Sequence, residues 1–286
     1  MTSSRAANRP DGAATGEVSA TISADRVPEM AIADLVEGAR HHEMWWNFAL
    51  HDIRQRFRRS MLGPFWITLS MGVMVGALAL VFGAIFAEEV EDFLPYLAVG
   101  LIFWNLLATT INEGCLTFIA AEGYVRNVPM PLSVHFYRML ARNLIVWAHN
   151  MVIYAVVFAI AIHSVNPAFL LAIPGLILFT VNLAWMSLMA AILSTRFRDI
   201  PQLISNALQV VFFVTPIFWS ISQFPDRPIF VLLNPAYHLL EVVRAPLLGQ
   251  APGMVSWAVA VGMALVGGWL TALLYRRAYP RIPYWV

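Results

Sequence analysis

Lysine is absent from this sequence, so all 18 of its basic residues are arginines. A chain without lysine cannot form the GxxxxGK[ST] loop that holds the phosphates of a nucleotide. The single cysteine, Cys115, excludes an internal disulfide bond. Charged residues are also scarce. They make up 12% of the chain, against about a quarter in soluble domains, while 59% of the residues are hydrophobic. This balance predicts an integral membrane protein.

Six stretches contain no ionised residue in their interior and approach the roughly 20 residues that a helix needs to cross a bilayer. They cover about residues 65–87, 94–112, 143–163, 168–193, 202–221 and 254–275. The fold class is therefore predicted to be an all-α polytopic membrane protein with six transmembrane helices. Its transmembrane domain is expected over residues 65–280.

The arginines predict how these spans are oriented. They precede the first span and follow the second, fourth and sixth, whereas acidic residues follow the first and no charge follows the third. Cytoplasmic loops are enriched in basic residues, so both termini are placed in the cytoplasm, which leaves only Arg227 and Arg244 outside. Residues 1–29 are small and polar without an apolar core, and we expect a disordered cytoplasmic tail rather than a signal peptide. Residues 281–286 form the cytoplasmic C-terminal end.

The spans carry little that points to chemistry. Ion-coupled carriers need titratable groups deep in their helices, and only Glu113, at the inner end of the second span, comes close. His41, His42 and Glu43 are adjacent, so on a helix their side chains point about 100° apart and do not predict a metal site. The sequence contains no HExxH and no pair of Asp-rich motifs. An enzyme is therefore the weaker interpretation.

Residues 30–64 are predicted to form a cytoplasmic amphipathic interface helix and a turn. Within residues 43–60, apolar side chains recur at helical spacing in one stripe: Trp46, Leu50, Ile53 and Phe57. A helix of this kind lies along the membrane surface, with its rings toward the acyl chains. Gly63 and Pro64 then allow the chain to turn into the first span.

A basic cluster ends this helix: Arg54, Arg56, Arg58 and Arg59. One interpretation is an anchor that binds anionic lipid and sets the orientation. The other is a platform at the cytoplasmic mouth of a path, where arginines hold a ligand's phosphates bidentately. A nucleic-acid site is not predicted, because no helix free of the membrane presents base-reading side chains.

Residues 222–253, between the fifth and sixth spans, are too apolar for a free loop and too interrupted to cross the membrane. Asn234 and Pro235 are typical of a helix start. Glu241 and Arg244 are spaced to pair on the following helix. We expect a re-entrant helical hairpin that dips into the outer leaflet, with simple interfacial helices as the alternative.

The motifs now described resemble the type-2 ABC exporter permeases of the polysaccharide-export family. The opening pattern R-x-R-[FY]-x-x-S-x-L-G-P-x-W is matched by Arg54, Arg56, Phe57, Ser60, Leu62, Gly63, Pro64 and Trp66, with Val81-Phe82-Gly83 ending the first span. Three further segments match in order: VRNVPMPLSV at 125–134, FRDIPQL at 197–203, and TPIFWS at 215–220 with NPAYHLLEVVR at 234–244. The resemblance covers about residues 43–280.

This resemblance implies the permease subunit of an ATP-driven exporter in the bacterial inner membrane. The implied substrate is a polyprenyl-pyrophosphate-linked polysaccharide of the O-antigen or capsule type, and membrane lipid is a further contact. The chain would form a homodimer and pair with two copies of a separate ATPase subunit, which binds the ATP and Mg. The chain itself is then neither an enzyme nor the holder of a cofactor.

The resemblance also implies three kinds of site. The access site for the lipid pyrophosphate comprises Arg54, Arg56, Arg58, Arg59, Leu62 and Gly63. Docking of the ATPase involves the 43–60 helix, the 113–130 segment and the 196–199 turn, with Glu122, Arg126, Asn127, Arg196, Arg198 and Asp199 as the named residues. Candidates for lining the channel are Trp104, Trp147, Tyr154, Trp185 and Trp219, which are alternatively packing or interfacial residues.

Three rival functions stay open at this point. The first is a teichoic-acid or other glycolipid exporter of the same class. The second is a membrane-embedded glycan-modifying enzyme, which would need acidic or histidine groups facing a cavity. The third is a passive channel, which would need no ATPase partner.

Overall fold

The computed structural model describes residues 27–63, 65–86, 90–161, 166–219, 221 and 229–286. Residues 1–26 of the tail predicted over 1–29, the turn residue Pro64 and Arg227 lie outside these ranges, while residues 27–29 of that prediction belong to a helix. The described residues form helices joined by short connections. The helices are α1 (Val27–Arg40), α2 (His42–Arg56), α3 (Phe65–Phe86), α4 (Val90–Ala120), α5 (Glu122–Asn127), α6 (Ser133–Ala161), η1 (Pro167–Leu171), α7 (Ala172–Arg196), α8 (Ile200–Val214), α9 (Ile229–Leu232), α10 (Pro235–Leu247), α11 (Met254–Ala278), η3 (Tyr279–Arg281) and α12 (Ile282–Trp285).

Five of the helical segments are long and apolar enough to cross a membrane: Phe65–Ile85, Phe93–Asn127, Ser133–Ala161, Pro167–Arg196 and Met254–Trp285. They correspond to five of the six predicted spans. The remaining prediction, 202–221, falls on α8, which is apolar but only 15 residues long. At 1.5 Å per residue, α8 is about 22 Å long, which is less than the hydrocarbon thickness of about 30 Å.

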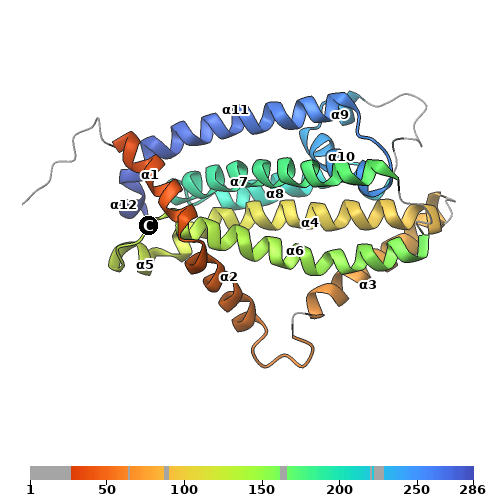
Figure 1. The fold of residues 1–286 in the computed structure, drawn as a ribbon, viewed down its shortest axis with the longest axis horizontal. Coiled ribbons are helices and arrows are strands. Elements are labelled where there is room, and N and C mark those ends of the chain that lie inside the picture. Colours follow the sequence, from red (N-terminus) through yellow and green to blue (C-terminus); the bar gives the residue numbers. More distant parts are fainter. Residues whose placement is uncertain (1–26, 64, 87–89, 162–165, 220, 222–228) are drawn as a thin grey trace, which may run out of the picture.

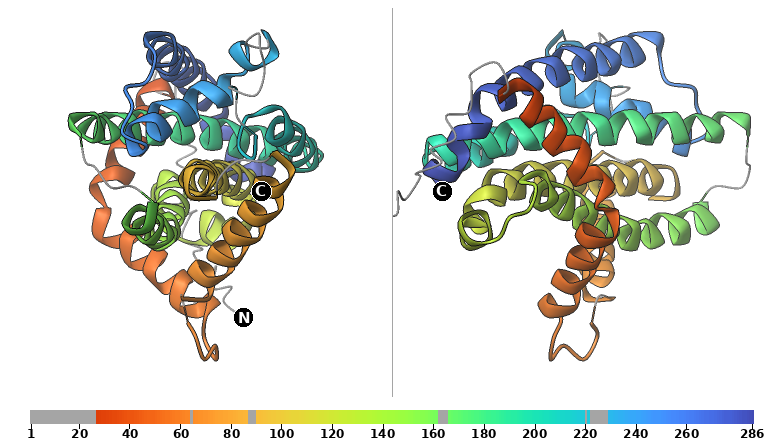
Figure 2. Two further views of the ribbon diagram at one scale, coloured as in Figure 1. Left: turned by 90° about the vertical axis from the view of Figure 1, so that its right-hand side faces the viewer. Right: turned by 60° about the vertical axis from the view of Figure 1, so that its left-hand side comes forward.

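Helix α4 lies at the centre of the bundle and contacts α3, α6, α7, α8 and α10. The helices α11, α7, α4 and α6 run roughly parallel, while α2 and α3 lie at an angle to them (Figure 1). The left view of Figure 2 looks along the bundle and shows the yellow α4 between the green α6 and the orange α3. The ring of Phe103 on α4 packs against Trp147 of α6 and Phe179 of α7, with centroids 5.4 Å apart in each case.

Two glycines allow α7 to approach its neighbours closely. A Cβ on Gly114 of α4 would lie 2.8 Å from the Cβ of Ser187. A Cβ on Gly175 of α7 would lie only 2.2 Å from the carbonyl oxygen of Val242 in α10. Because no real Cβ tolerates such distances, the absence of side chains at these positions sets the helix spacing.

Helix α10 packs against α7, α11 and α4. The expected start at Asn234 is confirmed, because its side chain accepts a hydrogen bond from the backbone N–H of Ala236 at 3.0 Å. The expected pair is also confirmed: Arg244 donates to Glu241 at 2.8 Å. The Arg244 guanidinium is buried, donates to the carbonyl of Pro216 at 2.6 Å and lies 4.2 Å from the ring centre of Tyr96. These contacts tie α10 to α4 and to the end of α8.

Helix α2 packs on α6 through one side of its surface. Ile53 and Ala49 are buried there, and the ring of Trp45 lies 6.1 Å from that of Tyr137. Of the predicted apolar stripe, Ile53 therefore faces the bundle, whereas Trp46 is 46% exposed. After α2 the chain runs away from the bundle and returns along α3 (Figure 1).

Candidate functional site

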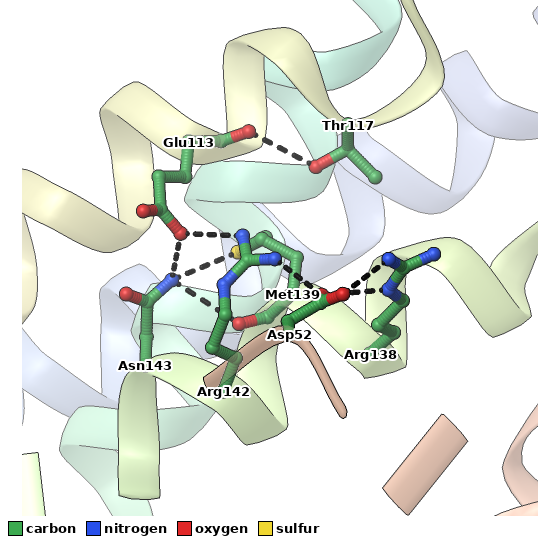
Figure 3. Close-up of polar contacts among 7 residues, drawn as sticks. All are labelled: Asp52, Glu113, Thr117, Arg138, Met139, Arg142 and Asn143. Atoms are coloured by element: carbon green, nitrogen blue, oxygen red, sulfur yellow. Dashed lines mark hydrogen bonds and ion pairs between the residues drawn. The ribbon is translucent and has the colours of Figure 1, made fainter. Parts of the chain in front are cut away.

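Three helices meet in a set of charged side chains that we call the Asp52 network: Asp52, Glu113, Arg138, Arg142 and Asn143 (Figure 3). Asp52 comes from α2, Glu113 from α4 and the other three from α6. Arg138 and Arg142 are four residues apart, so both point from one face of α6. The network lies where the apolar parts of α4 and α6 give way to the segments predicted to be cytoplasmic.

The geometry of the network joins α2 to α4 through a single side chain. Arg138 forms a bidentate pair with the Asp52 carboxylate, in which its Nε donates to Oδ2 at 2.8 Å. Arg142 donates from Nη1 to Asp52 at 2.7 Å and from Nη2 to Glu113 at 2.7 Å. The amide of Asn143 also donates to Glu113, at 2.9 Å. One guanidinium is thus shared between carboxylates of two different helices.

The charge balance keeps Asp52 ionised. Burial by itself would raise the pKa of Asp52, but the hydrogen bonds and positive charges of Arg138 and Arg142 lower it below the ordinary value of 3.8. Side-chain exposure is 12% for Asp52, 24% for Arg142 and 27% for Arg138. Charged hydrogen bonds in such a half-buried setting are stronger than surface pairs. The network is therefore a firm attachment of α2 to the bundle.

A cavity of about 260 Å³ opens beside the network. Glu113, Arg138 and Arg142 line it together with His135 and Thr117. The Thr117 hydroxyl donates to the backbone carbonyl of Glu113 at 3.1 Å. The cavity wall therefore contains cations, a carboxylate and a histidine contributed by α4 and α6.

A second buried carboxylate, Asp34 of α1, was not singled out from the sequence. It is 3% exposed and accepts hydrogen bonds from the backbone N–H groups of Leu132 at 2.7 Å and Ser133 at 3.0 Å. The hydroxyl of Tyr275, near the end of α11, donates to it at 2.7 Å. Helix N-termini leave free N–H groups, so Asp34 caps α6 from a distant part of the chain. Helices α1, α6 and α11 are joined at this point.

The predicted docking residues gather around the C-terminal helix α12. Arg126 pairs with Glu122 at 3.0 Å and donates to the backbone oxygen of Val286. Arg198 donates to the backbone carbonyl of Trp285 at 3.2 Å. The guanidinium of Arg196 lies 5.7 Å from the centre of the Trp285 ring. Asp199 is exposed at the start of α8, and Asn127 bonds within its own helix. The structure thus brings the two predicted segments together, with α12 between them.

The predicted 113–130 segment is divided by the structure. Its first eight residues continue α4 as far as Ala120, and α5 then forms a separate helix of six residues. Glu113 therefore belongs to the long central helix, and the short exposed helix begins at Glu122.

The predicted access residues lie at the end of α2, which includes Arg54 and Arg56, and in the exposed turn that follows it. Arg54, Arg56, Arg58 and Arg59 are all exposed, and none of them forms an ion pair within the described part of the chain. Arg59 has a φ of 75° and Gly63 a φ of 55°, so the chain turns through the left-handed region twice before α3. Leu62 is 48% exposed, and the N–H of Gly63 donates to Ser60. Arg56 lines a cavity of about 430 Å³ beside the bundle, and all four arginines keep exposed side chains.

The five aromatic candidates lie in different surroundings. Trp104 lines a cavity of about 350 Å³ between α3, α4 and α8. Trp147 packs on Phe103, the hydroxyl of Tyr154 donates to Leu247, and the indole of Trp185 donates to Asn182 at 2.9 Å. Trp219 lies beside Phe230. Within one copy of the chain, Trp147, Tyr154 and Trp185 thus occupy helix contacts, and Trp104 borders a cavity.

Sequence reasoning assigned Arg138 and Arg142 to membrane orientation alone and did not single out Asp52. A usable signal existed, because Glu113, Arg138 and Arg142 extend otherwise apolar helices and ions in such places require partners. For Asp34 no local signal existed, since its partners are about 100 and 240 positions away.

These observations define a polytopic helical membrane protein whose long helices are tied together by charged groups at one end. Residues 45–248 match the ABC-2 type transporter family, so the chain belongs to that family. The resemblance drawn from the motifs is thereby confirmed. Membership agrees with a transport subunit that lacks its own ATPase domain.

Curated relatives are found at modest identity. The O-antigen export system permease protein RfbA of Myxococcus xanthus is 26% identical over 198 residues, which cover 68% of this chain and 76% of the relative. Two proteins of the same name from Klebsiella pneumoniae are 22% and 21% identical over 184 and 183 residues. Each of these matches covers 62% of this chain and 68% of the relative.

Proposed function

We propose that the chain is the membrane permease subunit of an ATP-driven exporter that moves polyprenyl-pyrophosphate-linked polysaccharide, of O-antigen or capsule type, across the bacterial inner membrane. The observation that carries the proposal is the family match over residues 45–248 together with relatives that are each named O-antigen export permeases. The exposed turn after α2 and the predicted docking residues around α12 support it. An exporter of this kind needs both a site for its ligand and a surface for its ATPase partner.

The assembly in this proposal contains two copies of the chain and two copies of a separate ATPase subunit. The ATPase binds the ATP and Mg, since a chain without lysine cannot form the nucleotide loop. Its docking surface comprises α5, the turn from Arg196 to Asp199, and α12 between them. Because these elements lie at the ends of long helices, the helices transmit movements of the ATPase to the membrane spans.

In the membrane, the proposed arrangement has six spans with both termini in the cytoplasm. Helix α8 and the residues after it form the fifth span, and α9 with α10 forms a re-entrant hairpin on the outer side. Helix α2 lies along the inner surface, and the transmembrane domain extends over residues 65–280. The N-terminal tail and the last residues, 281–286, are both cytoplasmic.

The proposed path of the substrate starts at the exposed turn after α2. Its arginines hold the pyrophosphate of the lipid carrier, because guanidinium groups bind phosphate oxygens in a fixed bidentate geometry. Leu62 and Gly63 shape this access site. The glycan then moves between the two copies, with Trp104 and the other aromatic candidates offering flat faces to sugar rings.

The test is restoration of surface glycan in a strain that lacks its own O-antigen permease, with the chain expressed beside the ATPase from its own gene neighbourhood. The double variant Arg56→Ala, Arg59→Ala is expected to lower export by at least about tenfold, since each charged hydrogen bond contributes about 1.5–3 kcal/mol. Membrane insertion and ATPase association should be unchanged.

The matched control is Arg277→Ala with Arg281→Ala, which removes the same charge from exposed positions at the end of the last span. Export should persist in this control. If the first variant fails to insert, or if the control loses export equally, the arginines act through orientation alone. A wild-type chain that inserts and binds the ATPase but exports no glycan contradicts the proposed function itself.

A further inference from the structure

Helix α4 is buried on most sides, and three polar side chains lie on a partly exposed face of its middle part. Asn105, Thr109 and Asn112 follow one another at i, i+4 and i+7, so they share a face of the helix. All three are partly exposed, while the intervening Leu106, Leu107 and Ile111 are buried. A helix that faced lipid along this face would carry apolar side chains there.

Two cavities lie along this face and share Asn105. The first, of about 350 Å³, is bounded by α3, α4 and α8 and contains Asn112 and Gln209 in its wall. The second, of about 430 Å³, is bounded by α3, α4 and α6 and contains Thr109 and Asn150. Because both also share Met71 and Met74 of α3, they form neighbouring parts of one groove.

Several polar groups of the groove lack hydrogen-bond partners within the described part of the chain, whereas Asn112 donates to the carbonyl of Ala108 at 2.9 Å. Asn105 and Gln209 form no hydrogen bond there. The carboxamide oxygen of Asn150 is buried without a partner, and the residue is 1% exposed. A buried amide without a hydrogen-bond partner is unfavourable, so the Asn150 oxygen requires water or a ligand, whereas the partly exposed Asn105 and the exposed Gln209 are accessible to one.

The chemistry of the groove suits a neutral, hydroxyl-rich ligand. Every residue that lines the first cavity is uncharged, and two of them, Trp104 and Phe212, present rings whose centroids are 5.4 Å apart. Carboxamides both donate to and accept from hydroxyl groups. The second cavity adds Arg56 and Arg142 to its wall. Cations are thus confined to the part of the groove that adjoins the access turn.

We propose that this carboxamide groove, formed by Asn105, Thr109, Asn112, Asn150 and Gln209, binds the sugar hydroxyls of the polysaccharide during its passage. The inference rests on the proposed function and assigns the contacts with the chain of sugars to amide side chains. The aromatic residues predicted from the sequence contribute through Trp104, which lies in the same wall.

The experiment measures labelling of introduced cysteines by a charged, membrane-impermeant thiol reagent in the complete exporter. The background is Cys115→Ala, which removes the buried native thiol. Asn105→Cys and Gln209→Cys are compared with Val210→Cys, which neighbours Gln209, is 63% exposed and lines neither cavity. Membranes are permeabilised so that the reagent reaches both faces.

Both groove cysteines should be labelled at least about tenfold faster than Val210→Cys, because a charged reagent enters the hydrocarbon of the bilayer poorly. In membranes from cells that synthesise the lipid-linked glycan, their labelling should slow, and it should recover when ATP drives export. Equal labelling of all three positions overturns the groove.

A second measurement separates this inference from the function on which it rests. Asn105→Leu with Gln209→Leu should lower the length or the amount of exported glycan, while Val210→Leu should leave both unchanged. Rapid labelling without protection by glycan, in a chain that exports glycan normally, overturns the carboxamide contacts alone. A wild-type chain that exports nothing overturns the proposed function, whatever the labelling shows.

Discussion

Arg142 holds carboxylates of α2 and α4 at the same time, at 2.7 Å each. The Arg142 side chain forms two charged pairs, one through each terminal nitrogen of its guanidinium. The conformational entropy of ordering this side chain is lost only once for both pairs. The second pair therefore costs less entropy than an isolated one. At the residue scale this makes Asp52, which receives two arginines, the most sensitive member of the network.

Asp52→Asn is expected to lower the free energy of unfolding by on the order of 3 kcal/mol, because two half-buried arginines lose a charged acceptor. For a domain of this size the melting temperature should fall by about 6–12 °C in detergent. Glu43→Gln on the same helix is the matched control, since Glu43 is exposed and unpaired within the described residues. A shift of equal size in the control would contradict the role of the network.

The stability difference between the wild type and Asp52→Asn should depend on pH. The pKa of Asp52 is lowered on folding, so the carboxylate stabilises the protein above its ordinary pKa of 3.8, and this contribution is lost as the pH falls through the lowered value. Between neutral pH and about pH 3, the difference in melting temperature should therefore become smaller toward the acid end. A difference that persists unchanged at that pH would point to a packing effect.

At the element scale, the long helices continue past their apolar stretches. Helix α4 extends to Ala120 and α6 begins at Ser133, although the predicted spans cover only 94–112 and 143–163. Hydropathy ends a span at the first charges, whereas a helix continues as long as those charges find partners. Glu113, Arg138 and Arg142 find them in one another and in Asp52.

Gly175→Ala should separate α7 from α10. The new Cβ would lie 2.2 Å from the carbonyl oxygen of Val242, and a backbone atom cannot move aside as a flexible side chain does. We expect a loss of about 1–3 kcal/mol in stability, measured by thermal unfolding. Gly76→Ala, whose Cβ meets no atom within 4 Å, should leave stability unchanged or raise it slightly. Two indistinguishable variants would show that the helices are loosely packed.

At the scale of the whole molecule, the topology depends on α8. Whether α8 and the residues after it cross the membrane decides on which side the C-terminus lies. Five spans place the two ends on opposite sides, whereas six place them on the same side. Reporter domains fused before Val27 and after Val286 should both be cytoplasmic if α8 and the following residues cross. A C-terminal reporter found outside would limit the chain to the five long helices.

The class of fold and five of the spans could be predicted from the sequence, because hydropathy depends only on local composition. The start of α10 at Asn234 and the pair of Glu241 with Arg244 were also predictable, since capping and i,i+3 contacts are local. The roles of Asp34, Asp52 and α12 were not predictable. Each depends on residues far apart in the chain, and a charge in isolation indicates only that some partner exists.

The contact between Asp34 and Tyr275 has a consequence for biosynthesis. The two residues are 241 positions apart, and ribosomes add about 5–20 residues per second. Roughly 10 to 50 seconds therefore pass between the synthesis of the carboxylate and that of its tyrosine partner. During this interval the contacts of α1 with α11 and η3 cannot form, and its contacts with α6 form only after α6 has been made. Helix α1 is thus secured late in synthesis, and a chain released before Tyr275 leaves Asp34 without that hydroxyl.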